Sequence, residues 1–345
     1  MRLLIVTQAV DAEDPILGFF LRWIEGLAAQ VDYIEVVCLK EGRHALPQNV
    51  RVHSLGKECG AKSRVAYIFR FVSLVWRLRY HYDAVFVHMN EEYMLLAGLF
   101  WRLSGKRIIF WRNHRMGSWR TRIAMILSSA VCHTSPEAFV SRSSKAVLMP
   151  VGIDTEMFSL QDKGASESSS VLFIGRLDPV KRVEEFVEAV SKVSVLCKVD
   201  LYGSPTEPDS AYSRLIALKA QPLVERGVLT LYPAVPHDST PGLYRAHAVY
   251  VNLTPSGSLD KTIGEAMASG CVVVCANDAV RQVVRPELMV NTGDPREVAQ
   301  VLERATGLSR EDRFAEVRKL RAHIEQHHSL DALIRKIAML LRQYS

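Results

Sequence analysis

Two cations follow an apolar run in the segment GRLDPVKR, residues 175–182. The preceding run VLFI is typical of a buried strand, and the residues after the segment have the period of a helix. Arg176 and Lys181 would then lie at the carboxyl end of a strand, where Gly175 lets the chain turn close to a ligand. Arginine offers a planar fork of donors and lysine a point charge, so the pair suits a diphosphate. A surface loop with two solvated cations is the alternative, and the spacing alone does not decide.

A single carboxylate, Glu265, stands among small residues in the segment SGSLDKTIGEAMASG, residues 256–270. A helix is expected to begin near Asp260 or Lys261, and the free N–H groups at its start can hold an anion. Glu265, beyond the first turn, could accept hydrogen bonds from vicinal hydroxyls such as those of a ribose. The small residues around it would let ligand and sheet approach closely. The alternative is an acid on the face of a packed helix.

Two histidines are expected at the carboxyl ends of strands. His88 closes the run AVFVHM, residues 84–89, and His114 follows RIIFW, residues 107–111. Ligand sites of parallel sheets form at this edge. The alternative for each is a polar strand end that is hydrogen-bonded to backbone.

Strands that alternate with helical patterns are needed to position these residues. The alternation indicates right-handed βαβ units and parallel sheets, so the fold class is α/β. Strands are predicted at 3–7, 33–39, 50–55, 84–89, 107–111, 130–135, 146–151, 171–175, 198–203, 228–235, 248–255 and 271–278. Helices are predicted at 16–30, 62–80, 183–193, 211–226, 309–327 and 329–343.

The length of 345 residues suggests two domains. The polar stretch QDKGASESSS, residues 161–170, is interpreted as a linker. We therefore predict a Rossmann-like domain over 1–160, a second one over 171–327, and a C-terminal helix over 328–345 that could pack back on the first. The natural ligand site is the cleft between two such sheets.

The net charge of +6 lies entirely in the first half of the chain. Residues 1–160 carry 20 Lys and Arg against 14 Asp and Glu, whereas residues 161–345 carry 23 of each. This asymmetry indicates an anionic partner for the first half. The six cysteines form no C-x-x-C pair and His327-His328 has no acidic or cysteine cluster beside it, so buried thiols in a reducing compartment and no metal site are expected. No signal peptide or spanning segment is recognised, which predicts a cytoplasmic protein.

A basic, aromatic stretch lies between residues 101 and 122, inside the acid-free range 93–136. Its cations interleave with Trp101, Trp111 and Trp119, which suits an anionic membrane surface or the phosphates of a lipid-linked acceptor. The predicted helix over 62–80 could add a basic amphipathic face, so the protein could lie peripherally on the inner face of the cell membrane. Packed tryptophans with a solvated rim are the alternative. Nucleic acid is not an expected partner, because nothing beyond the charge resembles a nucleic-acid module.

Taken together, VLFIGRLDPVKRVEEFVEAV, EAMASGCVVV and MPVGIDTEMF resemble retaining glycosyltransferases of family 4, which have the GT-B fold. The resemblance covers most of the chain, and ILGFFLRWIEGLA fits the family's first loop and helix. It implies two Rossmann-like domains that face a cleft, with the acceptor on the first and the donor on the second. It also implies hexosyl transfer from a nucleotide-sugar substrate with retention, and neither metal nor cofactor.

The resemblance assigns roles to the residues singled out above. Arg176 and Lys181 match the family's diphosphate-binding cations, and Glu265 matches the ribose-binding glutamate of the E-x7-E motif. The first glutamate of that motif should fall at position 257, where this chain has Gly257. In the family that glutamate helps to position the donor sugar, so in this chain the backbone amides at the start of the helix are expected to do so. The expected donor-binding segment consists of Gly257, Ser258, Leu259, Asp260, Lys261 and Thr262.

Further assignments are looser. Gly18 matches the first-loop glycine that approaches the β-phosphate, and Ala234 and Val235 match the backbone segment that meets the base. A histidine of the first domain touches the donor sugar or the reacting centre in the family. His114 is our first choice for it and His88 the second.

The product implied is a glycoside of a cell-envelope polysaccharide or of a lipid-linked intermediate. Two other functions stay open. One is a sugar-nucleotide 2-epimerase-like enzyme of related fold. The other is a non-catalytic nucleotide-sugar-binding protein, which stays open because position 257 has glycine in place of the motif's first glutamate.

Overall fold

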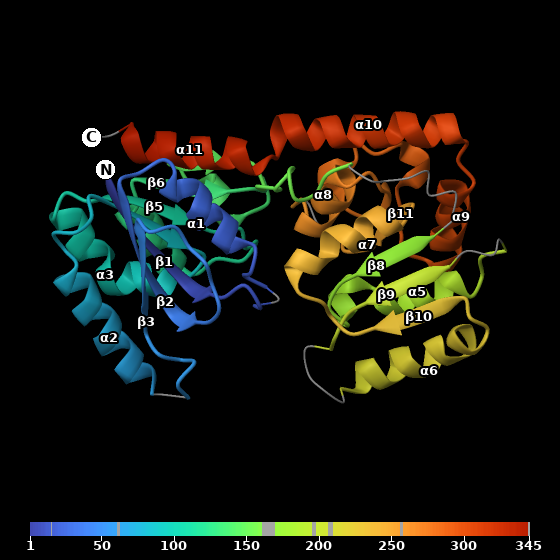
Figure 1. Cartoon of the computed structure of the whole chain (residues 1–345), viewed down its shortest axis with the longest axis horizontal. Coiled ribbons are helices and arrows are strands. Elements are labelled where there is room, and N and C mark those ends of the chain that lie inside the picture. The colour runs from blue at the N-terminus through green and yellow to red at the C-terminus, as the bar shows by residue number, and fades with distance from the viewer. Residues whose placement is uncertain are drawn as a thin grey trace. The chain divides into compact units, whose positions relative to one another are not determined.

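A computed structural model of the chain describes residues 1–14, 16–60, 63–160, 170–194, 198–205, 210–255 and 258–343. It divides into two compact units, one of residues 1–152 with 330–345 and one of residues 153–329 (Figure 1). The boundary lies at residue 152, whereas the sequence analysis set it at 160. Of the predicted linker 161–170, only Ser170 is among the described residues. The chain leaves the first unit at Gly152, whose φ of +78° is costly for other residue types, and a Cβ there would meet the side chain of Leu333.

The first unit is built on a seven-stranded parallel sheet with the order β3-β2-β1-β4-β5-β6-β7. Its central strands are buried on both faces, which is why they read as continuous apolar runs. The strands are β1 (Arg2–Val10), β2 (Tyr33–Glu41), β3 (Val50–Ser54), β4 (Ala84–His88), β5 (Arg107–Trp111), β6 (Ala130–His133) and β7 (Ala146–Leu148).

Helices cover both faces of this sheet. On one face α1 (Phe20–Ala28) and α11 (Leu330–Arg342) share a buried cluster with Ile5, Phe86 and Trp111. On the other, α2 (Arg64–Arg77), α3 (Glu91–Leu103) and α4 (Trp119–Leu127) pack over Val6, Val87 and Phe110. A short 3-10 helix, η1 (Phe139–Arg142), follows β6. The predicted helix 328–345 corresponds to α11, which belongs to this unit.

Two helices of the first unit, α3 and α4, had no counterpart in the sequence analysis. The apolar residues of α3 include both buried and exposed side chains, so the sequence shows no clear amphipathic period there. The predicted helix over 16–30 is shorter in the structure, because residues before Phe20 form a turn.

The second unit is built on a five-stranded parallel sheet with the order β10-β9-β8-β11-β12. Its strands are β8 (Val171–Ile174), β9 (Val199–Tyr202), β10 (Leu229–Tyr232), β11 (Val249–Asn252) and β12 (Val272–Cys275). Its helices are α5 (Val183–Val190), α6 (Ala211–Glu225), α7 (Thr240–Ala246), α8 (Lys261–Ala268), α9 (Pro295–Thr306) and α10 (Arg310–His327). The described residues of this unit also form the 3-10 turns η2 (Pro179–Lys181), η3 (His237–Ser239), η4 (Asp278–Val280) and η5 (Pro286–Leu288).

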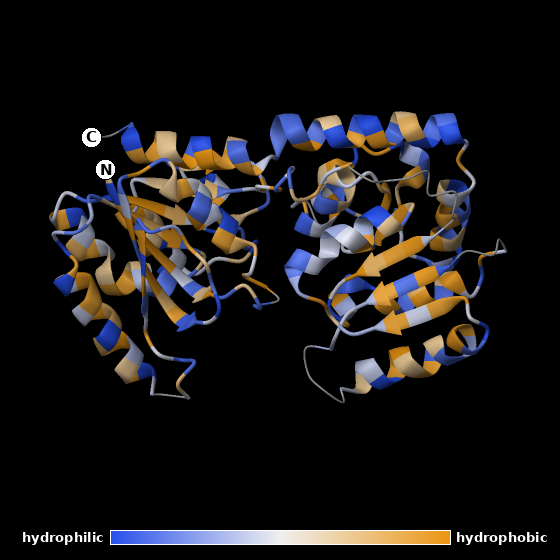
Figure 2. Ribbon diagram, viewed as in Figure 1, coloured by the Kyte–Doolittle hydropathy of each residue, from blue (hydrophilic) through white to orange (hydrophobic). Residues whose placement is uncertain are grey.

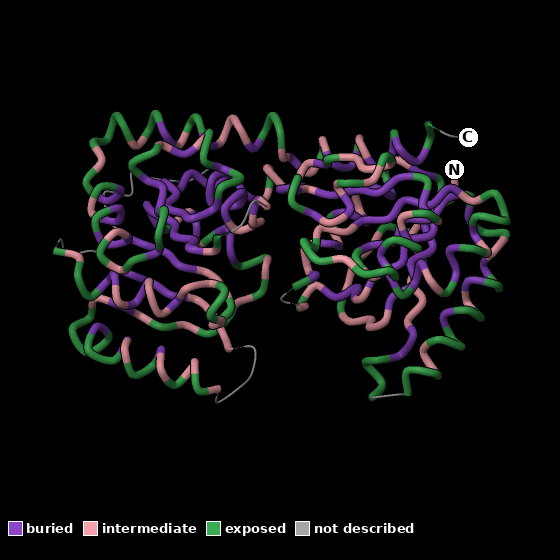
Figure 3. Tube along the Cα trace, turned by 180° about the vertical axis from the view of Figure 1, so that it is seen from behind, coloured by how far each residue is buried: buried purple, intermediate pink, exposed green. Residues whose placement is uncertain are grey.

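The strand order of this sheet reverses at β8, because the chain next adds strands on one side of it and then on the other. Crevices at such switch points, beyond the carboxyl ends of the strands, are where ligands bind in open parallel sheets. The predicted α/β class with two parallel, Rossmann-like sheets is confirmed. Figure 2 shows the hydrophobic strands at the centre of each unit, and Figure 3 shows that they are buried.

Over the described part of the chain, no helix combines the length and the apolarity that crossing a membrane would require. Cys38, Cys132, Cys271 and Cys275 are buried thiols and Cys59 is exposed, while Cys197 lies outside the described residues.

Candidate functional site

Small and polar residues gather at the carboxyl edge of the second sheet. Gly175 follows β8, Gly203 follows β9, Asn252 ends β11 and Asn277 lies just beyond β12. Parallel strands end at the same edge, so these residues border one region, and α8 begins there after the loop that follows β11. This edge is the candidate site.

The centre of the site is an ion pair between Lys181 and Asp260. The Lys181 Nζ donates to Asp260 Oδ2 at 2.6 Å, and both side chains are largely shielded from solvent. Asn252 Nδ2 donates to the same oxygen at 3.2 Å. The other oxygen, Oδ1, caps α8 by accepting the backbone N–H and the hydroxyl of Thr262, at 3.3 and 3.1 Å. One carboxylate thus ties the β8 loop, the end of β11 and the start of α8 together.

Several local contacts fix the backbone of the segment that carries Lys181. Asp178 caps η2 by accepting the N–H of Val180 at 2.9 Å, and Pro179 pre-sets the backbone of its first turn. Arg182 then adopts a left-handed conformation with φ 52°, which costs of order 1 kcal/mol for a residue other than glycine. Strain of this kind persists only where surrounding contacts enforce it, and it adjoins the residue that reaches Asp260.

Protonation at the site follows from burial and charge. Burial alone would raise the pKa of Asp260, but the Lys181 ammonium and the hydrogen bonds from Lys181, Asn252 and Thr262 hold that pKa below its usual value. A carboxyl whose folded pKa is depressed adds stability at neutral pH that is lost as the pH falls through the folded pKa. Lys261 differs, since desolvation lowers its pKa to about 8 against the opposing charges of Glu265 and Asp154.

Glu265 is 4% exposed and accepts two side-chain hydrogen bonds. His237 Nε2 lies 2.9 Å from its Oε1, and the hydroxyl of Tyr244 donates to Oε2 at 3.2 Å. Phe158 packs its ring against both partners. A carboxylate has about four acceptor positions, so acceptor capacity remains for a ligand hydroxyl.

The small residues around Glu265 have a packing role that the sequence did not show. A Cβ on Gly264 would lie 2.9 Å from the side chain of Ile153, so the glycine admits the segment that enters the second unit. Ala266 and Ala268 are fully buried. On this face α8 packs against other protein segments, and the small residues do not border a ligand there.

The other predicted donor residues of the second unit border the same edge. Leu259 is buried, and the carbonyl of Ser258 accepts from Asn277 Nδ2 at 2.9 Å. Gly257 lies outside the described residues. The backbone N–H of Ala234 donates to the Ser204 hydroxyl at 3.0 Å, and Val235 follows it.

Close backbone approach at this edge requires glycine at position 203. A Cβ on Gly203 would lie 2.1 Å from the carbonyl oxygen of Gly175, whereas a Cβ on Gly175 itself would make only ordinary contacts. The sequence analysis had assigned the close turn to Gly175.

Arg176 follows Gly175 and is exposed. Within the described ranges its side chain has no recorded hydrogen bond or ion pair, so all of its donors can reach a ligand.

In the first unit the predicted residues occupy different environments. Gly18 lies before α1, and its N–H donates to the carbonyl of Asp14 at 2.9 Å. His88 ends β4 but is only 2% exposed, because its ring stacks on Phe20 at 4.1 Å. The ring also lies against Trp23 and Phe86, so His88 is packed among aromatic side chains.

His114 is exposed, in the loop after β5. Its Nδ1 accepts from the backbone N–H of Met116 at 3.0 Å, and its Nε2 has no recorded partner within the described ranges. The neighbouring Arg112 pairs with the buried Glu91 at 3.3 Å, and Glu91 accepts from the Thr121 hydroxyl at 2.6 Å. This cluster fixes the loop on which His114 stands.

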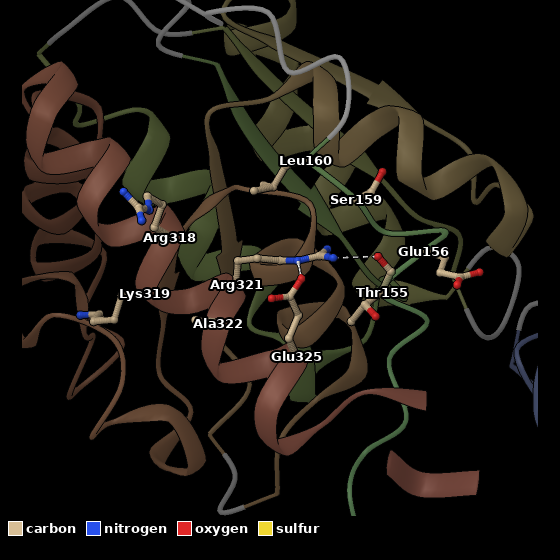
Figure 4. A pocket seen from close by; sticks show the side chains of 9 residues that line it. All are labelled: Thr155, Glu156, Ser159, Leu160, Arg318, Lys319, Arg321, Ala322 and Glu325. Atoms are coloured by element: carbon tan, nitrogen blue, oxygen red, sulfur yellow. Dashed lines mark hydrogen bonds and ion pairs between the residues drawn. The ribbon is translucent and has the colours of Figure 1, made fainter. Parts of the chain in front are cut away.

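A hollow of about 920 Å³ opens elsewhere in the second unit, between α10 and the segment after Ile153 (Figure 4). Arg321 reaches across it to the carbonyls of Thr155 and Ala268, at 2.8 and 2.7 Å. Ala268 ends α8, so the hollow is separated from the start of that helix by roughly 12 Å of helix length. It is not part of the candidate site.

Four site residues escaped the sequence analysis. They are His237, Tyr244, Asn252 and Asn277. The two asparagines carried a signal, since each stands at or just past the end of an apolar run, where polar residues face the ligand edge. His237 and Tyr244 carried none, because only the fold brings them to Glu265. Among the described residues, no group of three or more His, Cys, Asp or Glu could hold a metal ion.

The chain is similar to known proteins in the sequence of its second unit and in its fold. Residues 168–306, within the second unit, match the family described as glycosyl transferases group 1. No curated protein sequence matches the chain.

Several solved structures share its fold. The Anabaena protein Alr3699/HepE in complex with UDP and glucose has a TM-score of 0.78 at 16% identity, with 99% of each chain covered. Sucrose-phosphate synthase from Thermosynechococcus elongatus has a TM-score of 0.78 at 17% identity, again over 99% of each chain. A trehalose-6-phosphate synthase studied for glycosyltransfer with retention has a TM-score of 0.74 at 15% identity over 99% of each chain. The chain therefore has the GT-B fold, and residues 168–306 match the glycosyl transferases group 1 family.

Proposed function

We propose that this glycosyltransferase moves a hexosyl group from a nucleotide-diphosphate sugar to a saccharide or lipid-linked acceptor, with retention and without a metal. The observation that carries the donor half is the Lys181–Asp260 pair at the start of α8, within the part that matches the glycosyltransferase family. Retention, the family 4 assignment and a role in cell-envelope synthesis rest on the motif resemblance. The structure of a synthase studied for retention supports the first of these.

In this proposal the diphosphate lies against Arg176, Lys181 and the first turn of α8. Lysine has three donors, so Lys181 can bind Asp260 and still offer two to phosphate. The N–H groups at the start of α8 and the helix dipole add attraction for an anion. The ribose hydroxyls would use the acceptor capacity left on Glu265. UDP is the first nucleotide to test, because it is bound in a structure of the same fold.

The catalytic work is then positioning and charge stabilisation. The bond from the anomeric carbon to the diphosphate oxygen breaks, and a bond to the acceptor oxygen forms on the same face. The acceptor's proton passes to the departing phosphate oxygen, whose negative charge the two cations stabilise. His114, whose Nε2 has no partner among the described residues, is the residue we propose to contact the sugar or the acceptor.

A lipid-linked acceptor would place the enzyme on the inner face of the cell membrane as a peripheral protein. The first unit has an exposed face of apolar and cationic side chains that suits such a surface.

Incubating the protein with UDP-, GDP- and ADP-sugars, with and without saccharide and polyprenyl-phosphate acceptors, tests the proposal. Release of nucleoside diphosphate that depends on acceptor, with a glycoside of unchanged anomeric configuration, is the expected result. An epimerised donor would indicate a 2-epimerase-like enzyme instead. Binding without turnover across the panel would indicate a nucleotide-sugar-binding protein.

Nucleotide binding should depend on pH through Lys261. Its pKa of about 8 means that it is charged below that pH and neutral above it. We therefore expect the affinity for UDP to fall as the pH rises through about 8, with the midpoint displaced upward in the complex because the anion favours the charged lysine. Isothermal titration between neutral and alkaline pH measures this.

Arginine stays charged over that range, so Lys261→Arg should flatten the profile. Lys192→Arg, at an exposed lysine of the same unit, is the matched control and should keep the wild-type profile. Superimposable profiles for wild type and Lys261→Arg would remove Lys261 from the anion site.

A further inference from the structure

The outer sides of α2, α3 and α4 carry apolar side chains where a helix on a sheet normally presents polar ones. On α2 the core-facing residues include Phe71 and Val75, yet a second apolar stripe is exposed. Its members are Val65, Ile68, Phe69, Val72 and Trp76. Their spacing of i, i+3, i+4, i+7 and i+11 puts them on one side of the helix. Figure 2 shows hydrophobic and hydrophilic residues interleaved along α2.

The two neighbouring helices repeat this pattern. Leu96, Leu99 and Leu103 form an exposed stripe on α3, and Trp119, Ile123 and Ile126 form one on α4. Exposure reaches 80% at Leu103, 72% at Phe69 and 65% at Trp119.

The three stripes belong to one surface, which we call the three-helix face. The rings of Trp76 on α2 and Phe100 on α3 lie 5.6 Å apart. Arg102 at the end of α3 donates to the carbonyl of Ile126 on α4 at 2.7 Å. All three helices pack on the same side of the first sheet. An apolar surface of this extent on a protein generally marks an interaction site.

Cations border the stripes, and their charges are not neutralised by the protein. The exposed arginines on these helices are Arg64, Arg70, Arg77, Arg102, Arg120 and Arg122. None of them forms an ion pair with an acidic side chain of the described residues. Two arginines lie over aromatic rings: Arg79, just past the end of α2, is 4.4 Å from Trp76, and Arg120 is 5.6 Å from Trp119. Against these six arginines, Glu92 on α3 is the one exposed acidic residue within the three helices.

We propose that the three-helix face binds an anionic lipid surface. Exposed leucine, phenylalanine and tryptophan can enter the boundary between headgroups and acyl chains, while arginines beside them meet lipid phosphates. A second copy of the chain would bring cations against cations, which opposes self-association. A nucleic acid would use the charge but leave the aliphatic stripes without an apolar partner. This inference is independent of the donor chemistry, so either can fail without the other.

Vesicle binding of the full chain, without any nucleotide, tests the proposal. We expect the protein to sediment with phosphatidylcholine vesicles that contain phosphatidylglycerol, to sediment less as salt rises, and not to bind phosphatidylcholine alone. Absence of binding to the anionic vesicles at low salt would overturn the proposal.

Two sets of variants separate a specific face from general charge. The triple change Arg64→Gln, Arg77→Gln and Arg122→Gln should weaken the partition by about 100-fold, since each cation near an anionic surface contributes roughly fivefold. Arg296→Gln, Arg304→Gln and Arg310→Gln remove the same charge from exposed positions of the second unit and should leave binding unchanged. Equal losses in the two triples would show that net charge, and not this face, drives binding.

The apolar contribution has its own variants. Phe69→Gln with Leu103→Gln and Trp119→Gln should reduce binding by at least about tenfold, because exposed apolar area no longer leaves water on binding. Leu218→Gln with Phe314→Gln, exposed residues of the second unit, serve as the control. Unchanged binding in the triple would contradict insertion. A wild-type dimer that this triple converts to a monomer would assign the face to a second copy and overturn the proposal.

Discussion

Replacing Lys181 by glutamine is expected to lower kcat/KM for the donor by about 10²- to 10³-fold, in the range seen when a charge-stabilising donor is removed. The departing diphosphate would lose a cation that the protein holds in place through Asp260 at 2.6 Å. Steady-state kinetics with the donor found in the panel measures the effect. Stability should fall as well, by about 2 kcal/mol, because Asp260 loses a charged partner while it remains largely buried.

A second variant separates these two effects. Adding Asp260→Asn to Lys181→Gln removes the unpaired charge and keeps a residue that caps helices well, so stability should recover while activity does not. Recovery of both would mean that Lys181 acts only through the fold.

Arg176→Ala gives the matching test at an exposed position. It should reduce turnover with little change in the free energy of unfolding, because its side chain is exposed. Wild-type kinetics in both Lys181→Gln and Arg176→Ala would take the two cations out of the site.

Replacing Glu265 by glutamine is expected to weaken nucleotide binding by about 10- to 100-fold, the value of a hydrogen bond to a charged acceptor. The wild type should prefer UDP to 2′,3′-dideoxy-UDP by a similar factor. Glu265→Gln should lose that preference, because the group that reads the ribose hydroxyls is weakened. Isothermal titration with the two nucleotides forms a cycle that isolates this contact.

The control for a purely structural role is Tyr244→Phe. It removes the hydrogen bond to Glu265 Oε2 while it leaves the carboxylate in place. We expect a lower melting temperature but a retained preference for ribose. If Glu265→Gln keeps the preference too, Glu265 serves only to hold His237 and Tyr244.

Much of the fold was visible in the sequence because parallel strands buried on both faces leave continuous apolar runs. The runs that contain β1, β4, β5, β8 and β12 could each be assigned from residue types alone. Helix α3 could not, because its apolar side chains serve both the core and the exposed stripe, and one periodicity cannot report two faces. The sequence did not indicate the boundary at Gly152. The polar stretch after residue 160 is the clearer compositional signal of a linker, and the positive φ of Gly152 cannot be read from residue type.

The candidate site divides in the same way. Cations after a strand and a carboxylate early in a helix are local features, so Arg176, Lys181 and Glu265 could be named in advance. Their partners are contributed by segments distant in the chain: Asp260 lies far from Lys181 in sequence, and His237 lies well before Glu265. For His88, the position at a strand end could be predicted from neighbouring residues. Its stacking on Phe20 could not, because Phe20 lies far away in the sequence.

By itself, the sequence determined the α/β class, the two sheets and the residue types at the edge of the candidate site, since these follow from periodicity and from the order of elements. Only the tertiary structure decided that Lys181 is paired with Asp260, that Gly264 admits Ile153, and that three helices align their exposed apolar stripes. Such contacts join residues far apart in the chain, and burial and charge pairing are properties of the packed molecule that no local pattern encodes.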